Sequence, residues 1–257
     1  MKQAETEGNC FLCGVTLKKI KMKNHVLKAH LSEANDEKVM LVKAEGFYSK
    51  DYWLLLDIAL NAGLTDLDSF LRRIWLECCQ HMSAFRPMID RRVERESVAM
   101  SRKIKDFAPG DKLVHEYDFG SKTSLLITML AGGERPPQKA PVRLLARNVP
   151  RVFRCTECGK PAEILCYTCS LSYGYNDASC YCEACFEKHD CRNKECSLPI
   201  LNSPRSGVCG YCGERDVWNF DPERIAAGHC AACTVKPPVC TCITGVRCCD
   251  PPLKSRR

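Results

Sequence analysis

The sequence predicts an α+β fold, because one strongly amphipathic helical segment lies among short, alternating apolar segments in the middle of the chain. Hydrophobic residues make up 45% of the 257 residues, which is enough for a real core. Most of the 21 cysteines lie outside this middle region. We therefore expect a central domain of strand, helix and antiparallel sheet over residues 46–149, flanked by small modules that are rich in cysteine.

The central domain is expected to begin with a buried strand and a helix. Residues 52–60 are mainly aromatic and aliphatic, and they end at the turn Asn61-Ala62-Gly63. Thr65 and Asp68 have the spacing of a capping box, and the apolar residues that follow recur at intervals of three and four. This pattern predicts a helix over residues 66–77.

Several shorter segments after this helix are expected to complete an antiparallel sheet. Their apolar alternation and bounding turns predict strands over residues 85–89, 112–119, 125–130 and 142–146, with Pro87 interrupting the first. The charged stretch 91–105 is expected to leave the sheet as an excursion. A polar stretch over residues 32–38 is predicted to link this domain to the N-terminal module.

Pairs of cysteines separated by two residues indicate metal binding. In so tight a turn both sulfurs can reach one ion at about 2.3 Å, whereas an unstrained disulfide needs a Cα separation and Cβ directions that the turn rarely gives. Three pairs are followed directly by glycine, at Gly14, Gly159 and Gly213, which suits the tight turn of a zinc knuckle. The odd number of cysteines also argues against a secreted disulfide scaffold. Zinc is the metal we expect.

The N-terminal module, residues 1–31, is expected to be a zinc finger of the C2H2 type. Its ligands would be Cys10, Cys13, His25 and His30, with a spacer one residue shorter than usual. A helix from residue 24 would carry both histidines. The competing interpretation is a basic amphipathic helix whose histidines are incidental.

Residues 150–200 carry the strongest metal pattern, eight ligands for two zinc ions. In a cross-brace, the first ion would take Cys155, Cys158, Cys182 and Cys185, and the second would take Cys166, Cys169, His189 and Cys191. This spacing resembles that of B-box fingers, although the last pair here is His-x-Cys. A sequential pairing, with residues 155–169 closing around one ion, is compatible with the same spacing.

Residues 201–235 are expected to form a ribbon-like module, followed by a tail rich in cysteine and proline over residues 236–257. The ribbon ligands would be Cys209, Cys212, Cys230 and Cys233. The tail cysteines Cys240, Cys242, Cys248 and Cys249 are expected to be loose thiols or partial ligands. This gives three or four zinc ions, and because four ligands close each site, the ions are expected to be structural rather than catalytic.

Three segments of the central region resemble the plasmid pRiA Orf-three-like family. They are residues 68–85, the run Tyr117-Asp-Phe-Gly-Ser-Lys-Thr123 and the strand ending at Asn148, and the resemblance extends to Cys155 and to residues 202–211 in the zinc-bearing subgroup of that family. Members of the family occur in plasmids, insertion elements and prokaryotic genomes. The resemblance implies no chemistry, because the family offers no established activity to carry over. Cys212 departs from the usual subgroup pattern.

Charge patterning gives two classes of partner. The formal net charge is +7, but thiolates bound to zinc would lower it to about +2, which weakens the case for nucleic acid. Candidate phosphate contacts are Lys19, Lys21, Lys23, Arg143, Arg147 and Arg151. The alternative partner is a protein, since B-box-like modules bind proteins, and such a charge run is commonly just a solvated face. No apolar run approaches the 18 residues of a membrane span, so we expect a cytoplasmic protein without a membrane segment.

Reactive side chains are few in the central domain. Cys78, Cys79 and His81, next to Glu77, are its one compact reactive group. Cys78 continues the apolar helical face, so it is expected to be an inert core thiol; the alternatives are a nucleophile activated by His81 or a further metal site. We find no phosphate loop and no small-molecule substrate site. The expected function is a multi-zinc adaptor that is not an enzyme, and the alternative is a mobile-element enzyme or thiol redox sensor that uses Cys78, Cys79 and the tail cysteines.

Overall fold

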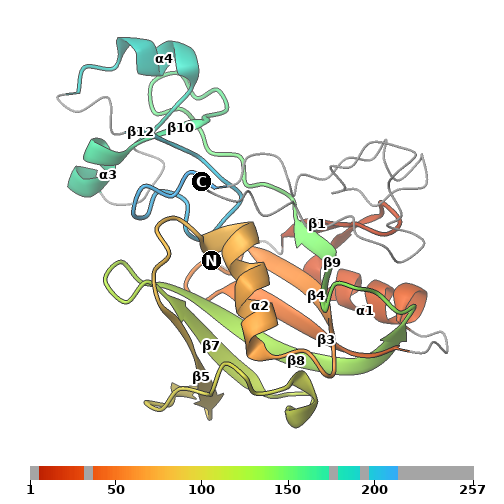
Figure 1. The fold of residues 1–257 in the computed structure, drawn as a ribbon. Helices are drawn as coiled ribbons and strands as arrows, with labels where there is room; N and C mark the ends of the chain where they lie inside the picture. The colour runs from red at the N-terminus through yellow and green to blue at the C-terminus, as the bar shows by residue number, and fades with distance from the viewer. Residues whose placement is uncertain (1–5, 32–36, 174–178, 192–196, 214–257) are drawn as a thin grey trace.

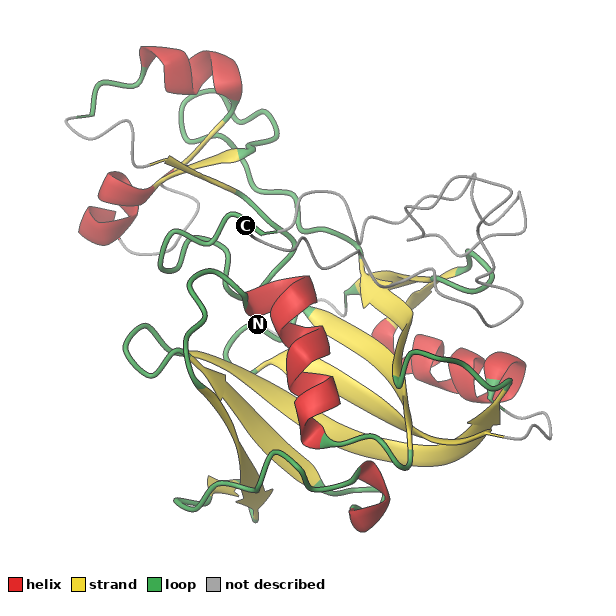
Figure 2. Ribbon diagram, viewed as in Figure 1, coloured by secondary structure: helices red, strands yellow, loops and turns green. Residues whose placement is uncertain are grey.

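The computed structural model describes residues 6–31, 37–173, 179–191 and 197–213. Helices pack against a large antiparallel sheet, and a smaller cysteine-rich unit lies apart from that sheet (Figure 2). The predicted α+β class is therefore confirmed. No helix within these ranges has the length and apolar character needed to cross a membrane.

The large sheet has nine strands in the order β2-β1-β9-β4-β3-β8-β7-β5-β6, all paired antiparallel. The strands are β1 (Glu7–Cys10), β2 (Thr16–Lys18), β3 (Glu37–Gly46), β4 (Trp53–Ala59), β5 (Ser83–Ile89), β6 (Arg92–Val93), β7 (Lys112–Tyr117), β8 (Thr123–Arg135) and β9 (Val142–Asn148). The predicted strands all lie within or next to these. In β4 the side chains from Trp53 to Ile58 are buried on both faces of the sheet.

Each face of the sheet is covered by one helix, α1 (Lys19–His30) or α2 (Leu64–Leu71) (Figure 1). The larger apolar cluster, which includes Phe70 and Trp75, packs between α2 and the sheet. The second cluster includes Met22 and Val26 of α1 and Trp53 of β4. The core is thus a sheet sandwiched between two helices that come from different parts of the sequence.

The strand β3 lies in the middle of the sheet, in a segment for which no strand is predicted from the sequence. It pairs with β4 on one side and with β8 on the other. Its start at Glu37 lies inside the predicted polar linker, and the central sheet therefore begins nine residues before the predicted domain boundary at residue 46. The charged Lys43 and Glu45 disguise this strand, and Glu45 is nevertheless buried because it pairs with Lys19 and with Lys43.

The N-terminal finger is continuous with the central sheet. Cys10 of β1 pairs with Ala146 of β9, and the backbone N–H of Phe11 donates to the carbonyl of Leu145 at 2.8 Å. Gly8 lies so close to Trp53 that an added Cβ would be 2.4 Å from the ring. The finger is therefore built onto the domain and is not a separate bead on a linker.

The helix α2 starts two residues earlier than predicted and ends in a wider turn. The side chain of Asp66, rather than the predicted Asp68, caps the helix by accepting from the N–H of Gly63 at 2.8 Å. After Leu71 the chain continues as one π-helical stretch, η1 (Arg72–Leu76). Such π turns often mark functional sites, and this one delivers the next residues to the edge of the core.

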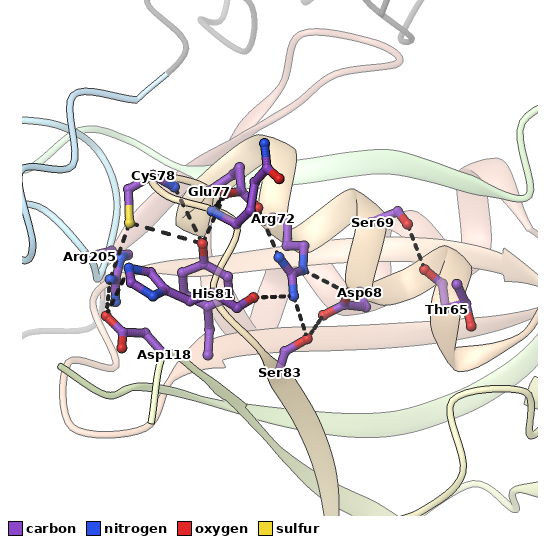
Figure 3. A network of polar contacts seen from close by, with 12 residues as sticks. Thr65, Asp68, Ser69, Arg72, Glu77, Cys78, His81, Ser83, Asp118 and Arg205 are labelled. Atoms are coloured by element: carbon purple, nitrogen blue, oxygen red, sulfur yellow. Dashed lines mark hydrogen bonds and ion pairs between the residues drawn. The ribbon is translucent and has the colours of Figure 1, made fainter. Parts of the chain in front are cut away.

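Asp68 faces inward and makes a buried polar contact. Its Oδ1 lies 2.7 Å from Nε2 of His115. The same oxygen accepts from Ser83 at 2.7 Å, and Oδ2 accepts from Arg72 at 2.8 Å (Figure 3). Burial raises the pKa of this carboxyl, but the hydrogen bonds from His115 and Ser83 outweigh burial, and the pKa lies below its ordinary value.

Asp68→Asn is expected to remove part of the dependence of stability on acid pH. A carboxyl with a lowered pKa in the folded chain stabilises the fold fully above its unfolded pKa of about 3.9 and loses that contribution as pH falls through the folded value. Urea midpoints of both proteins, measured from about pH 6 to about pH 3, should differ most at the higher pH and converge as the pH falls. A constant difference would show that the charge of Asp68 contributes nothing.

A second, smaller sheet has the strand order β11-β10-β12. Its strands are β10 (Ile164–Cys166), β11 (Cys180–Tyr181) and β12 (Ser197–Pro199), and two short helices accompany them, α3 (Tyr167–Tyr173) and α4 (Glu183–Lys188). The apolar cluster of this unit is small, and half of its residues are cysteines. This cluster is smaller than the two clusters around the large sheet. Packing of apolar side chains alone therefore gives this unit little stability.

The segment that follows β12 returns to the central domain. The indole N–H of Trp75 donates to the carbonyl of Asn202 at 3.0 Å, and Ser203 donates to the carbonyl of Trp75 at 2.7 Å. Arg205 is completely buried and donates to Thr123 at 2.9 Å and to the carbonyl of Ser121 at 3.0 Å. These contacts join the C-terminal part of the described chain to the end of α2.

Candidate metal centres

Among the described residues, four groups of cysteine and histidine side chains could each hold a metal ion. Within each group the sulfur and ring nitrogen atoms all lie within 4.8 Å of one another. The groups, named here sites 1 to 4, are Cys10, Cys13, His25 and His30; Cys155, Cys158, Cys182 and Cys185; Cys166, Cys169, His189 and Cys191; and Cys78, Cys79, His81 and Cys209. Each group has four members, which is the number of ligands in a closed tetrahedral site.

The separations between ligand atoms match the edges of a tetrahedron around zinc. Zinc-to-ligand bonds of about 2.3 Å to sulfur and about 2.05 Å to nitrogen give edges of about 3.8 Å between sulfurs, 3.6 Å between sulfur and nitrogen and 3.4 Å between nitrogens. In the structure the sulfurs are 3.6 Å apart at Cys158 and Cys182 and 3.8 Å apart at Cys166 and Cys191. A disulfide would place two sulfurs about 2.05 Å apart, and all cysteines in the described ranges are free.

Site 1 is assembled by β1, the turn after it and α1. Gly14, with φ of +81°, donates its N–H to the carbonyl of Cys10 at 2.9 Å and closes the turn between the two cysteines. His25 and His30 reach across from α1, with their Nε2 atoms 3.2 Å apart, and each lies next to a cysteine, 3.2 Å from the Sγ of Cys13 and 3.4 Å from the Sγ of Cys10 respectively. The structure thus brings together all four residues predicted for the finger.

Burial favours the neutral forms of both kinds of ligand in site 1. It raises the pKa of the Cys10 thiol to about 12 and, chiefly through the same loss of solvent, lowers the pKa of His30 to about 4. A neutral imidazole is the form that binds a metal. A bound divalent cation would supply the positive charge that a thiolate at Cys10 needs.

Site 2 lies between the loop after residue 154 and the start of α4. Gly159, with φ of +70°, donates its N–H to the carbonyl of Cys155 at 2.9 Å, and Cys182 immediately precedes α4. Burial raises the pKa of the Cys155 thiol, but backbone hydrogen bonds outweigh burial and lower the pKa to about 6. These N–H groups therefore favour the thiolate, which is the form that binds a metal.

Site 3 joins the end of β10 and α3 to the chain after α4. The Sγ of Cys169 lies 3.3 Å from Nε2 of His189. The ring of His189 packs against Tyr181 and Phe186, with centroid separations of 4.3 and 5.9 Å, and these contacts orient the imidazole. Because sites 2 and 3 each take ligands from alternate pairs, their grouping is that of a cross-brace rather than the sequential alternative.

The predicted ribbon site is not assembled among the described residues. Cys209 lies beside Cys78, Cys79 and His81, while the thiol of Cys212 is exposed and contacts the carbonyl of Gly210 at 3.3 Å. The other predicted ribbon ligands and the tail cysteines lie outside the described residues; they are Cys230, Cys233, Cys240, Cys242, Cys248 and Cys249. Because half of its predicted ligands lie outside the described residues, the ribbon site stays a prediction.

The predicted phosphate-binding arginines are largely used inside the protein. Arg143 pairs with the buried Asp57, its Nε donating at 2.7 Å. Arg147 is 8% exposed and donates to the carbonyl of Asn202 at 2.5 Å, and burial lowers its pKa to about 10. Of the arginines proposed from sequence, Arg151 is exposed, with its guanidinium 4.8 Å above the ring of Phe153.

The lysines proposed for phosphate binding all lie on the finger helix α1. Lys19 pairs with Glu45 and donates to the carbonyl of Lys50 at 3.1 Å. Lys21 is exposed and Lys23 is half-buried. Three of the six candidates, Lys19, Arg143 and Arg147, therefore have partners inside the protein, whereas Lys21 and Arg151 are exposed.

Comparison with known proteins gives little further information. No family model matches the sequence, and no curated protein matches it. A solved structure that matches part of this chain is that of a protein of unknown function, MM3350, from Methanosarcina mazei Go1. The two sequences are 16% identical, the match covers 43% of this chain and 67% of that chain, and the TM-score is 0.35. The function is therefore argued from the metal centres themselves.

Proposed function

We propose that this protein is a multi-zinc adaptor in which sites 1, 2 and 3 hold zinc ions that stabilise the finger and the cross-brace. The observation that carries the proposal is that four ligand atoms converge at each site with the spacing of a zinc tetrahedron. The mixture of thiolate and imidazole ligands favours zinc over calcium or magnesium, which prefer oxygen.

The zinc ions in this proposal are structural. A catalytic zinc keeps an open position for water or substrate, whereas four protein ligands leave none. The alternative function, a mobile-element enzyme or a thiol redox sensor that uses Cys78 and Cys79, gains no further support, because Cys209 and His81 stand next to these thiols and complete a four-ligand group. We further propose that the central domain belongs to the plasmid pRiA Orf-three-like family, on the motifs that resemble it.

We propose a protein as the macromolecular partner, in the cytoplasm. The internal pairing of Arg143, Arg147 and Lys19 removes half of the cations on which the nucleic-acid alternative depends. Large apolar side chains are exposed beside the joint between the central domain and the cross-brace, as at Val149 and Val152, which are 41% and 63% exposed. Exposed apolar side chains of this kind can be covered by a protein partner, whereas a nucleic-acid backbone would gain little from them.

Nuclease treatment separates the two partner classes. Affinity purification from host lysate is expected to recover the same proteins with and without nuclease, and binding should weaken little between about 50 and 200 mM salt, because few phosphate contacts would be broken. Val152→Asp should reduce recovery, and Lys21→Glu is the matched control on the exposed basic helix. Loss of the partner after nuclease treatment, together with sensitivity to Lys21→Glu, would support nucleic acid instead.

A further inference from the structure

Site 4 joins two segments that are far apart in the sequence. Cys78 and Cys79 follow Glu77, the residue after the π-helical stretch η1, and His81 lies two residues before β5. Figure 3 shows Cys78 and His81 on this turn. Cys209 comes from the segment that returns after the cross-brace, and its Sγ lies 3.4 Å from Nε2 of His81. The π turn and the returning segment therefore bring these four side chains to one point at the edge of the central core.

We propose that site 4 binds a zinc ion through Cys78, Cys79, His81 and Cys209, and that this ion fastens the C-terminal segment to the central domain. Their ligand atoms lie within the same 4.8 Å limit as the other sites. The sulfur-to-nitrogen separation of 3.4 Å is close to the edge of about 3.6 Å expected around zinc. The proposal shares the zinc chemistry of the proposed function and is independent of its partner.

The backbone around site 4 is held in an uncommon conformation. Gln80 and Cys209 have φ values of +59° and +50°, a left-handed region that residues with a side chain rarely adopt. The N–H of Gln80 donates to Oε1 of Glu77 at 2.5 Å, which fixes the turn that presents the two adjacent cysteines. Such strain persists where surrounding contacts enforce it, and it clusters at ligand-binding sites.

A buried cation stands next to the proposed ion. Nη2 of Arg205 lies 3.3 Å from the Sγ of Cys78 and donates to Oδ2 of Asp118 at 2.6 Å. Three thiolates around one divalent ion leave a net charge of −1, and a guanidinium at this distance offsets that charge and donates to a ligand sulfur. Arg205 thus has the position and the charge of an outer-sphere partner.

Asp118 lies close to the site but is already engaged. Its Oδ2 is 3.5 Å from Nε2 of His81, while its Oδ1 accepts from the N–H groups of Gly120 and Ser121, each at 3.1 Å. With one oxygen held by Arg205 and the other by two N–H groups, the carboxylate acts outside the coordination sphere. The four inner ligands remain three sulfurs and one imidazole.

The ion would complete a joint that hydrogen bonds begin. Asn202 and Ser203 already bond to Trp75, and Arg205 bonds to the turn before β8. A coordination bond from Cys209 would attach the C-terminal end of this segment to the central domain. Because the segment directly follows β12, the joint also fixes where the cross-brace leaves the central domain.

Zinc content of the full chain tests this assignment directly. Elemental analysis of purified Cys209→Ala is expected to show one zinc per chain fewer than the wild type, while Cys212→Ala, three residues away and outside the group, should match the wild type. Trypsin should also cleave Cys209→Ala faster at Arg205. An unchanged zinc content in Cys209→Ala overturns site 4, and an equal loss in both variants indicates the ribbon site instead.

A spectroscopic variant covers the case in which Cys209→Ala does not fold. In cobalt-substituted protein, His81→Cys is expected to keep the wild-type cobalt content and to strengthen the thiolate-to-cobalt charge-transfer absorption, because a fourth sulfur joins the ion. An unchanged spectrum at equal cobalt content would remove His81 from the coordination sphere. A wild-type protein that folds with no zinc at all would instead refute the proposed function.

Discussion

Stripping metal with a high-affinity chelator is expected to unfold the cross-brace, residues 155–191, while the central sheet stays folded. Half of the residues in the small apolar cluster of the cross-brace are cysteines, and most of these are proposed zinc ligands. Structural zinc supplies about 10 to 16 kcal/mol of apparent binding free energy, which in so small a unit is folding free energy. The central sheet has two large apolar clusters of its own.

Limited proteolysis after chelation measures this difference. The cross-brace should be digested within the time that leaves a fragment of about residues 37–148 intact, and added zinc should restore protection. Cys155→Ser, which removes one ligand of site 2, should reproduce the sensitivity without a chelator, and Cys212→Ser is its matched control. Equal resistance of the cross-brace before and after complete metal removal would show that packing alone holds it.

Asp57→Ala is expected to lower the free energy of unfolding by about 3 to 5 kcal/mol, because it leaves buried positive charge without its partner. Asp57 is completely buried in β4 and pairs with both Arg135 and Arg143. Arg135 is also completely buried, and its remaining acidic partner is Glu37, at 2.7 Å. The carboxylate of Asp57 is therefore shared by two guanidinium groups, and its loss leaves Arg143 without this partner and Arg135 with Glu37 alone.

Urea unfolding of the central domain checks this value. The control is Glu116→Gln, because Glu116 also pairs with two cations, but these are more open to solvent, with 27% of the side chain of Arg86 and 45% of that of Lys122 exposed. Exposed pairs of this kind contribute about 0 to 1 kcal/mol, so the two variants should differ several-fold. Similar losses for both would mean that solvent reaches Asp57 in the folded protein.

The sequence identified the elements whose patterns are local. The amphipathic face of α2 and the apolar run of β4 are visible in consecutive residues, and both elements exist. The strand β3 escaped because Lys43 and Glu45 break its apolar pattern, and their burial depends on Lys19, which comes from the finger. When a charged residue is paired with a residue that is distant in the sequence, its local sequence alone predicts that it is exposed.

The metal centres divide in the same way. Paired cysteines reveal themselves by spacing, and the structure gathers the groups expected for the finger and the cross-brace. The adjacent cysteines Cys78 and Cys79 have no such spacing, and one member of their group, Cys209, lies far away in the sequence. The signal that remained was a compact Cys-Cys-x-His sequence in a region otherwise free of cysteine. Only tertiary structure could supply the fourth member.

The pairing of Cys10 with Ala146 has a consequence for the order of events during translation. The four finger residues leave the ribosome early, whereas β9, the strand on which the finger docks, is the last strand of the large sheet to be made. Chains generally fold as they emerge, and contacts between distant residues form late. During translation the finger can therefore dock onto the large sheet only after β9 has been synthesised.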